Sequence, residues 1–557
     1  MKRRTVLGGI GGLVACSALG TSSSTLQGLE QNKESRMKAP QFYPDKVCAF
    51  PGDEVAVHAS YNGDSCRLVI TRVAAKEEHV ATLEGLAIDA HATAPDAGRD
   101  GCQWPRAFSF TVGSDWLPGY YDLKLEGRDG EYTRHFICVK RALDASAASA
   151  VLVLSTSTYQ AYNYWGGANA YAHVEKLLSG ELSPEDARDQ ALGVLSLNRP
   201  YAQGMFAPPP GMPRLISIAP RDFGEPGVLG DMDWFAKHQP TPYDGSAGYL
   251  GKWEHKFAAW CERNGYDIDY LTDHDFETGE DVLSRYGTVI LAGHSEYWSG
   301  RQRDSLDAYV EAGGHLAVFS GNTGYWKVRW ESDATRLVCH KWKGEENDPL
   351  FSDPSGKRDA THLWSHPAFG RSEAEVTGLS FLYGGYHRLG MCVARGAAAY
   401  TVYHDKHWAL DGTDLFYGDQ IGGDVPLIGY ENDGCPIRFG KDGLPKPDGG
   451  IGIPDNLEII AMAPATPFEP PENPFPFMIP PEKPDILARV AYGEANSDTR
   501  ARLARGHVVM ASFEKGRGEV FNGGTTEWAH GLAAGNPYIE KITHNVLARF
   551  GVVRQPV

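Results

Sequence analysis

The chain has 557 residues, of which 42% are hydrophobic and 22% are charged, so it is long enough for two or three domains and has a globular composition. Its formal net charge of −18 argues against nucleic acid or an anionic membrane surface as a partner, because both attract clusters of Lys and Arg. The sequence also lacks an apolar run long enough for a transmembrane helix.

The first sixteen residues indicate an export signal that takes no part in the fold. Lys2-Arg3-Arg4 resembles a twin-arginine signal, and Leu13-Val14-Ala15-Cys16 resembles a bacterial lipobox in which Cys16 carries the lipid. The alternative is a signal that is cleaved further along, with Cys16 incidental. Either way we expect a periplasmic or cell-surface protein, and with the lipobox a lipid anchor at Cys16 would be its only contact with the membrane. The polar residues 17–40 predict a flexible tether.

Residues 41–142 predict a small antiparallel β-sandwich. Hydrophobic residues alternate with polar ones, as at Val55 and Val57 or at Leu68 and Ile70, and turns with Gly and Asp separate these runs. A rigid packing module is one interpretation of this domain, and glycan binding is the other.

Four cysteines fall in the same stretch, namely Cys48, Cys66, Cys102 and Cys138. An oxidising compartment permits disulfides among them. Twin-arginine export carries folded proteins, so these cysteines could equally remain small buried hydrophobic residues. The sequence does not determine a pairing.

From residue 147 to the C-terminus at 557, strand and helix patterns alternate. Short apolar runs predict buried strands at residues 150–154, 288–292 and 316–319, and residues 267–271 are expected to form a further strand. Helical spacing of apolar residues predicts helices near 253–261, 306–310 and 536–550. Such alternation builds a parallel sheet. We therefore expect a Rossmann-like domain related to the class I glutamine amidotransferases. Within it, the proline-rich stretch 445–484 is expected to be a long surface insertion.

Three of these strands are followed by polar and aromatic residues. Tyr159 and Tyr162 come after the first strand, His294-Ser295-Glu296 after the third, and Asn322 after the fourth. Because the carboxyl ends of parallel strands meet at one edge, these segments can meet in one crevice. Residues 194–201 have a similar pattern and are expected to bring a fourth segment.

The side chains at this edge are oxygen donors with one His and no Cys. Phenolate and carboxylate are hard ligands, which suit a highly charged hard ion better than a thiolate-type zinc site. Burying two tyrosines beside a glutamate is costly unless a positive charge compensates. The pattern therefore predicts a metal site.

Other chemistries lack their motifs. A class I amidotransferase needs a nucleophilic Cys on a Gly-x-Cys-x-Gly turn, and none is present; nor is there a His-Glu-x-x-His zinc motif. The turn Gly293-His294-Ser295-Glu296-Tyr297 almost matches the serine-nucleophile motif but lacks its final glycine. Serine hydrolysis through Ser295 remains an alternative.

At these residues the chain resembles the large (β) subunit of N,N-dimethylformamidase and the relatives of its C-terminal domain. The resemblance covers about residues 150–555. Its motifs, in chain order, are Tyr159-Gln160-Ala161-Tyr162-Asn163 with Gly166-Gly167, Arg199-Pro200-Tyr201, Gly293-His294-Ser295-Glu296-Tyr297-Trp298, Ser320-Gly321-Asn322-Thr323-Gly324-Tyr325-Trp326, and Gly429-Tyr430-Glu431-Asn432-Asp433.

The resemblance implies one Fe³⁺ per chain and amide hydrolysis by a metal-activated water. Carried over to this sequence, it implies Tyr162, Tyr201 and Glu296 as iron ligands, with Tyr159 as the rival of Tyr162. It further implies His294 as an acid–base or supporting residue, Asn322 and Glu431 as residues that orient water or substrate, and Lys341 as a further catalytic candidate.

Two functions follow as hypotheses. The first is an exported, iron-dependent amidohydrolase that cleaves a small-molecule amide, as a homo-oligomer or with a small partner subunit like that of the known enzyme. The second is a non-catalytic cell-surface lipoprotein that binds glycan or peptide in the same crevice. Export is unusual for an enzyme of solvent catabolism, and the chain is shorter than the known large subunit, so we expect either another substrate or a site that has become a binding pocket.

Export can be tested through the paired arginines. Since the export machinery reads both, Arg3→Lys with Arg4→Lys should retain the protein in the cytoplasm, as cell fractionation would show. Cys16→Ser should release it from the membrane fraction. Unchanged membrane attachment of the Cys16→Ser protein would contradict the lipid anchor.

Overall fold

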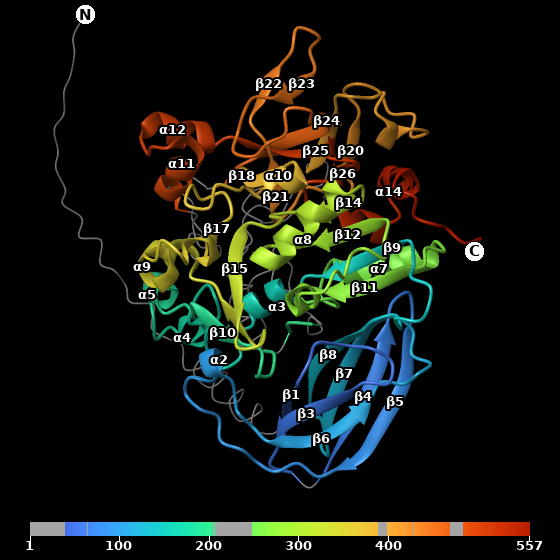
Figure 1. Ribbon diagram of the computed structural model, residues 1–557, viewed down its shortest axis with the longest axis vertical. Coiled ribbons are helices and arrows are strands. Elements are labelled where there is room, and N and C mark those ends of the chain that lie inside the picture. The colour runs from blue at the N-terminus through green and yellow to red at the C-terminus, as the bar shows by residue number, and fades with distance from the viewer. Residues whose placement is uncertain are drawn as a thin grey trace, which may run out of the picture.

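The computed structural model describes residues 39–63, 65–202, 204–206, 248–387, 398–425, 427–467 and 483–556. The predicted signal and almost all of the tether lie outside these ranges. Among the described residues, no helix combines the length and the apolar character needed to cross a bilayer. The protein is a mixed α/β structure with several sheets (Figure 1).

Two sheets form the N-terminal part, drawn in blue in Figure 1. The first has the order β1-β3-β6 and the second the order β2-β8-β7-β4-β5. Their strands are β1 (Gln41–Pro44), β2 (Cys48–Ala49), β3 (Glu54–Ser60), β4 (Cys66–Val73), β5 (Glu77–Leu86), β6 (Arg106–Thr111), β7 (Gly119–Gly127) and β8 (Tyr132–Val139). The predicted alternation is confirmed, because Val55 and Val57 of the first sheet share one buried cluster with Leu68 and Ile70 of the second.

The pairing in this part is not antiparallel throughout, since β2 runs parallel to β8. Cys48 of β2 lies directly opposite Cys138 of β8 in that pair. All seven cysteines in the described ranges are free thiols. Of the two expectations for the N-terminal cysteines, the structure therefore shows the reduced one.

A nine-stranded sheet forms the centre of the molecule, with the order β11-β9-β12-β14-β26-β25-β24-β19-β20. Its first five strands are parallel, and the other four pair antiparallel. The strands are β9 (Ala150–Leu154), β11 (Ile268–Thr272), β12 (Thr288–Gly293), β14 (His315–Ser320), β19 (Ala399–Val402), β20 (Gln420–Gly422), β24 (Glu458–Ala465), β25 (Gly506–Lys515) and β26 (Gly518–Asn522). The four strands predicted from the sequence are all in the parallel half.

Helices cover both faces of the parallel half. Ile290 and Phe319 share a buried cluster with Phe257 of α7 (Glu254–Arg263) and Ile542 of α14 (Pro537–Arg549). The alternate strand residues, such as Leu291, share a second cluster with α8 (Gly300–Glu311). Because both faces are buried, the strands are continuously apolar, and this explains why they could be recognised in the sequence.

The remaining elements are shorter. A small sheet contains β10 (Val194–Ser196), β13 (Tyr297–Ser299), β15 (Trp326–Glu331), β16 (Arg336–Val338) and β17 (His362–Leu363), and two further pairs are β18 (Ser380–Gly385) with β21 (Asn432–Gly434) and β22 (Ile437–Phe439) with β23 (Pro445–Pro447). The short helices are α2 (Ala97–Asp100), α3 (Thr156–Tyr162), α4 (Val174–Leu178), α5 (Pro184–Asp189), α9 (Gly344–Asn347), α10 (Ala374–Thr377), α11 (Pro484–Tyr492), α12 (Ser497–Leu503) and α13 (Trp528–Ala533).

The stretch 445–484 differs from the expected surface insertion. It contains β24, which lies between β25 and β19 inside the central sheet, and whose Ile460 and Ala461 are fully buried. Pro454 and Pro467 lie on either side of this strand and Pro464 is near its end, so none of them interrupts its apolar middle. Proline content alone therefore does not indicate a surface insertion. Residues 468–482 of the stretch lie outside the described ranges.

Candidate functional site

The site lies at the carboxyl edge of β9, β12 and β14, which are neighbours in the sheet. This confirms the prediction that the segments following these strands meet. β9 leads into α3, β12 into the turn that carries His294 and Glu296, and β14 into Asn322. Crevices at this edge are where open α/β sheets bind their ligands.

Glu296 is the centre of the site. Its carboxylate is buried and accepts hydrogen bonds from Tyr162 Oη at 3.2 Å and from Asn322 Nδ2 at 3.2 Å. It also accepts from Trp326 Nε1 at 2.8 Å and from Tyr171 Oη at 3.0 Å. Four donors from separate segments thus satisfy one carboxylate, as a buried charge requires.

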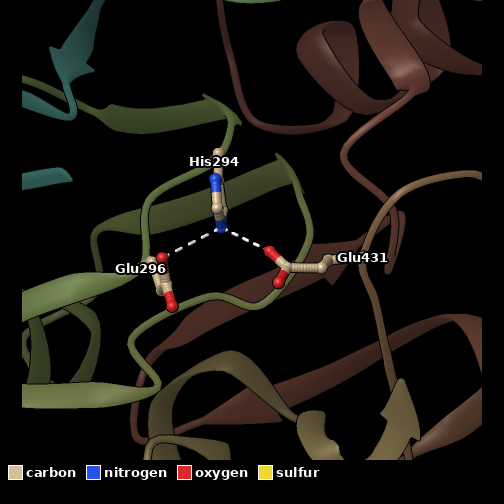
Figure 2. Close-up of side chains that lie close together, drawn as sticks. All are labelled: His294, Glu296 and Glu431. Carbon is tan, nitrogen blue, oxygen red and sulfur yellow. Dashed lines mark ion pairs between the residues drawn. The ribbon is translucent and has the colours of Figure 1, made fainter. Parts of the chain in front are cut away.

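His294 connects Glu296 to a second buried carboxylate (Figure 2). Its Nε2 lies 3.2 Å from Oε2 of Glu296 and 2.5 Å from Oε2 of Glu431. One ligand atom from each of the three residues lies within 4.8 Å of the others. Such a spacing allows all three to bind one metal ion.

Two glycines allow this close approach. Gly293 has φ +81°, and a Cβ there would collide with Trp253, whose ring packs against His294. Gly321 lies so close to the backbone of Glu431 that any side chain would overlap its carbonyl oxygen. Gly321 therefore lets the segment of Glu431, which leads into β21 outside the central sheet, reach the end of a parallel strand.

The structure separates the two tyrosines that the sequence left as rivals. Both are on α3, but Tyr162 donates to Glu296, whereas Tyr159 donates to the buried carboxylate of Glu254 on α7. Glu254 also accepts from the backbone N–H of Ser155 at 2.8 Å. Tyr159 therefore belongs to a different hydrogen-bonded group.

Tyr201 is not brought to this cluster, contrary to expectation. Its ring packs against His135, Phe136 and Phe206, and its Oη is buried without a hydrogen-bond partner among the described residues. The reason is topological: β10, which precedes it, pairs antiparallel with β16 in the small sheet and does not join the central sheet. Its end therefore does not share the edge of β9, β12 and β14.

Tyr171 is the residue that sequence reasoning missed. Besides donating to Glu296, its Oη lies 2.8 Å from Tyr162 Oη and accepts from Tyr297 Oη at 2.5 Å. Lys341 Nζ donates to Tyr297 Oη at 3.1 Å, which continues this chain of hydrogen bonds. The signal available in the sequence was weak, since Tyr171 follows no strand and belongs to none of the motifs.

Two residues of the site have an unusual backbone conformation. Asn322 has φ 54° and Lys341 has φ 51°, values that are uncommon outside glycine. Lys341 is buried, with Nζ over the ring of Tyr171, and Asn322 Oδ1 lacks a hydrogen-bond partner among the described residues. Such conformations concentrate at functional sites, where the surroundings hold them in place.

Burial sets the electrostatics of the site. It raises the pKa of Glu296 above its ordinary value; nearby His294 opposes this shift and Glu431 adds to it. It also raises the pKa values of Tyr162 and Tyr171, and the negative charge of Glu296 adds to both shifts. The phenols therefore keep their protons and donate them to Glu296 unless a positive charge enters the cluster.

A cavity of about 410 Å³ opens onto these residues. Glu296, Glu431, Tyr162, Tyr171 and Lys341 all line it. Ser295 does not, and its Oγ accepts a hydrogen bond from Trp298 Nε1 at 2.9 Å. The geometry therefore gives no support to serine hydrolysis.

Fold and site together define an α/β protein with a buried carboxylate, histidine and phenol cluster at the carboxyl edge of its sheet. The chain belongs to the family described as N,N-dimethylformamidase beta subunit-like, C-terminal, which matches residues 58–542. The match begins in β3, well before the start of the motifs seen in the sequence, and so includes most of the N-terminal sheets.

Two curated relatives are N,N-dimethylformamidase beta subunits. The one from Paracoccus aminophilus is 26% identical over 216 residues, covering 37% of this chain and 26% of the relative. The one from Alcaligenes sp. is 24% identical over 245 residues, covering 41% of this chain and 28% of the relative. The matched part of this chain thus spans little more than a quarter of their length.

Among solved structures, a cycloisomaltooligosaccharide glucanotransferase of Paenibacillus sp. matches with a TM-score of 0.14 and 14% identity. That match covers 24% of this chain and 19% of the other chain. A likeness this slight carries no argument about fold or function.

Glu254 gives a test of the electrostatics away from the cavity. Burial raises its pKa from 4.5 to about 7, so the folded chain holds this proton more tightly than the unfolded chain does. The protonated Glu254 therefore stabilises the fold at a pH below its pKa in the unfolded chain. This stabilisation, on the order of 3 kcal/mol, is lost as the pH rises through its pKa in the folded chain. We expect Glu254→Gln to flatten the fall in the free energy of unfolding between about pH 5 and pH 8.

Urea unfolding at a series of pH values would measure this effect. Glu280→Gln, which changes an exposed glutamate, is the matched control and should leave the pH dependence as it is. Identical curves for wild type and Glu254→Gln would contradict the raised pKa.

Proposed function

We propose that this protein is a metal-dependent amidohydrolase that cleaves a C–N bond with water. The observation that carries the proposal is the convergence of Tyr162, Tyr171, His294 and Glu431 on the buried Glu296 at the wall of a cavity. Membership of the dimethylformamidase-like family supports the same chemistry. A binding protein would have no need to bury two carboxylates and a histidine in mutual contact.

The residues present fit a hard metal ion. Two buried carboxylates lie on either side of one histidine, and like charges this close raise the free energy of the fold unless a cation offsets them. Glu296 and the phenols of Tyr162 and Tyr171 would hold the ion, with Glu431 completing the set. Phenolate and carboxylate oxygens favour Fe³⁺, which we propose as the ion, one per chain.

When bound, the ion would acidify a water molecule and polarise the amide carbonyl. His294 would carry a proton between water and the departing amine, and its Nε2 is held between the two carboxylates. Glu431 stabilises the protonated imidazole. Asn322 holds Glu296 in position through its amide.

Lys341 acts from the opposite side of the phenols. Its ammonium group offsets part of the negative charge of Glu296 and donates to Tyr297. A positive charge at this place favours loss of the phenol protons, which metal binding requires.

We also propose a more detailed description of the two parts of the fold, a location outside the cytoplasm and a partner subunit. The shared core of the two N-terminal sheets supports a β-sandwich, and the doubly covered parallel strands support an amidotransferase-like domain. The paired arginines and Cys16 support export and lipid attachment. The relatives are named as beta subunits, which supports a small partner subunit.

The metal assignment predicts colour. Protein purified without chelator should contain iron and absorb visible light, because electrons move from phenolate to Fe³⁺. Tyr162→Phe and Tyr171→Phe should each weaken the band and lower the iron content. Tyr201→Phe is the matched control, since the same hydroxyl is removed from a different aromatic cluster.

Absorption spectra and metal analysis would give both readouts. Colourless, iron-free protein under oxidising conditions would refute the iron site. A band lost in Tyr201→Phe but retained in Tyr171→Phe would show that the resemblance, and not the geometry, identified the second phenol.

The proton role of His294 predicts a loss of turnover. His294→Ala should retain the metal while kcat falls by about 10²- to 10⁴-fold, the usual contribution of a positioned acid–base group. His255→Ala, at a half-buried histidine of α7, should keep full activity. Simultaneous loss of metal and activity in His294→Ala would instead make His294 a ligand.

A further inference from the structure

The cavity is larger than the proposed chemistry needs. Its volume is about 410 Å³, within the range of about 300–1,000 Å³ that takes drug-sized ligands. Dimethylformamide has five non-hydrogen atoms and occupies on the order of 100 Å³, judged from the volume of liquid water. Most of the cavity would stay unfilled by such a substrate.

Aromatic side chains form much of the wall next to the carboxylates. Trp326 and Trp342 lie at a ring distance of 4.8 Å, and Tyr386 and Tyr430 at 6.0 Å; all four line the cavity. Trp326, Tyr386 and Tyr430 are buried. Walls of this kind favour a flat apolar or aromatic group over a small, strongly hydrated molecule.

Charged residues surround the outer part of the same cavity. Lys343 pairs with Asp189 at 2.9 Å, and the side chains of both are more than 40% exposed. Arg188 and Lys483 also line the cavity, and both lie close enough to Asp189 to help lower the pKa of its carboxyl. Glu185 and Glu346 complete this set. The lining thus changes from buried aromatic near Glu296 to exposed and charged further out.

We propose that the substrate is an amide that carries an aromatic ring, with a polar group beyond the ring. The amide lies at Glu296, the ring between the aromatic walls, and the polar group among the outer charges. In the reaction, the water oxygen bonds to the carbonyl carbon, the C–N bond breaks, and the amine leaves with a proton from water. This inference rests on the proposed function and adds the class of substrate.

The test compares formamides with the same scissile bond and similar leaving amines. N-Benzyl-N-methylformamide should have a kcat/KM about 100-fold above that of N,N-dimethylformamide, since filling an apolar pocket gives discrimination of this order. Its 4-carboxybenzyl derivative should be cleaved at least as well. Quenching of tryptophan fluorescence would report binding independently, because Trp326 and Trp342 line the cavity.

A variant that fills part of the cavity tests whether the cavity causes the preference for the benzyl substrate. Ala191 lines the cavity, so Ala191→Phe should lower kcat/KM for the benzyl substrate about ten-fold more than that for dimethylformamide. Ala312→Phe adds the same ring at an exposed residue after α8. This control should leave the ratio of the two kcat/KM values unchanged.

The outcomes separate the two proposals. Equal or higher kcat/KM for dimethylformamide would overturn the substrate class and leave the amidohydrolase standing. Quenching by the benzyl compound without hydrolysis of any amide would overturn the proposed function and support the aromatic pocket. If kcat/KM for the 4-carboxybenzyl derivative were more than ten-fold below that for the benzyl substrate, the proposed contact of a polar group with the outer charges would be overturned.

Discussion

The burial of one carboxylate, that of Glu296, is the constraint on which the site depends. A carboxylate removed from water is expensive unless each lone pair finds a donor. Here the donors come from α3, from the loop after it, from the segment after β14 and from β15. Each segment must be placed correctly for the others to remain satisfied, so the carboxylate determines how the loops at this edge pack.

The central sheet and a separate pair of strands both contribute to this arrangement. The parallel half of the sheet brings Tyr162, His294, Glu296 and Asn322 to one edge through neighbouring strands. Glu431 comes from the segment just before β21, a strand that pairs with β18 outside the central sheet, and Gly321 lets this segment come close because it has no side chain in the way. A cluster assembled in this way holds charged groups together more closely than solvent-exposed loops could.

The environment of the cavity changes from the buried cluster at Glu296 to its outer part. Near Glu296 the walls are buried and aromatic, which strengthens electrostatic interactions and excludes water. Further out, exposed charges of both signs line the same space. The family match covers most of the chain, whereas the curated relatives match only over parts of both chains. The proposed reaction type thus rests on family membership together with the site, and the proposed size of the substrate rests on the volume of the cavity.

The sequence by itself determined four of the five parallel strands, the edge at which they end, and the residues His294, Glu296 and Asn322 that follow two of them. It could do so because strands buried on both faces are continuously apolar and their ends are marked by an abrupt change to polar residues. Burial also explains why the helices at 253–261 and 536–550 could be predicted. Their apolar residues recur at helical spacing because one face of each helix packs on the sheet.

Only the tertiary structure decided which phenols meet Glu296. Tyr159 and Tyr162 differ by three positions on one short helix, and whether each meets Glu254 or Glu296 depends on how that helix packs. Tyr201 follows a strand that pairs outside the central sheet, while Tyr171 follows none and still donates to Glu296. Likewise β24 lies in the sheet although prolines flank it. Strand pairing and loop packing arise from contacts between distant residues, which local patterns do not record.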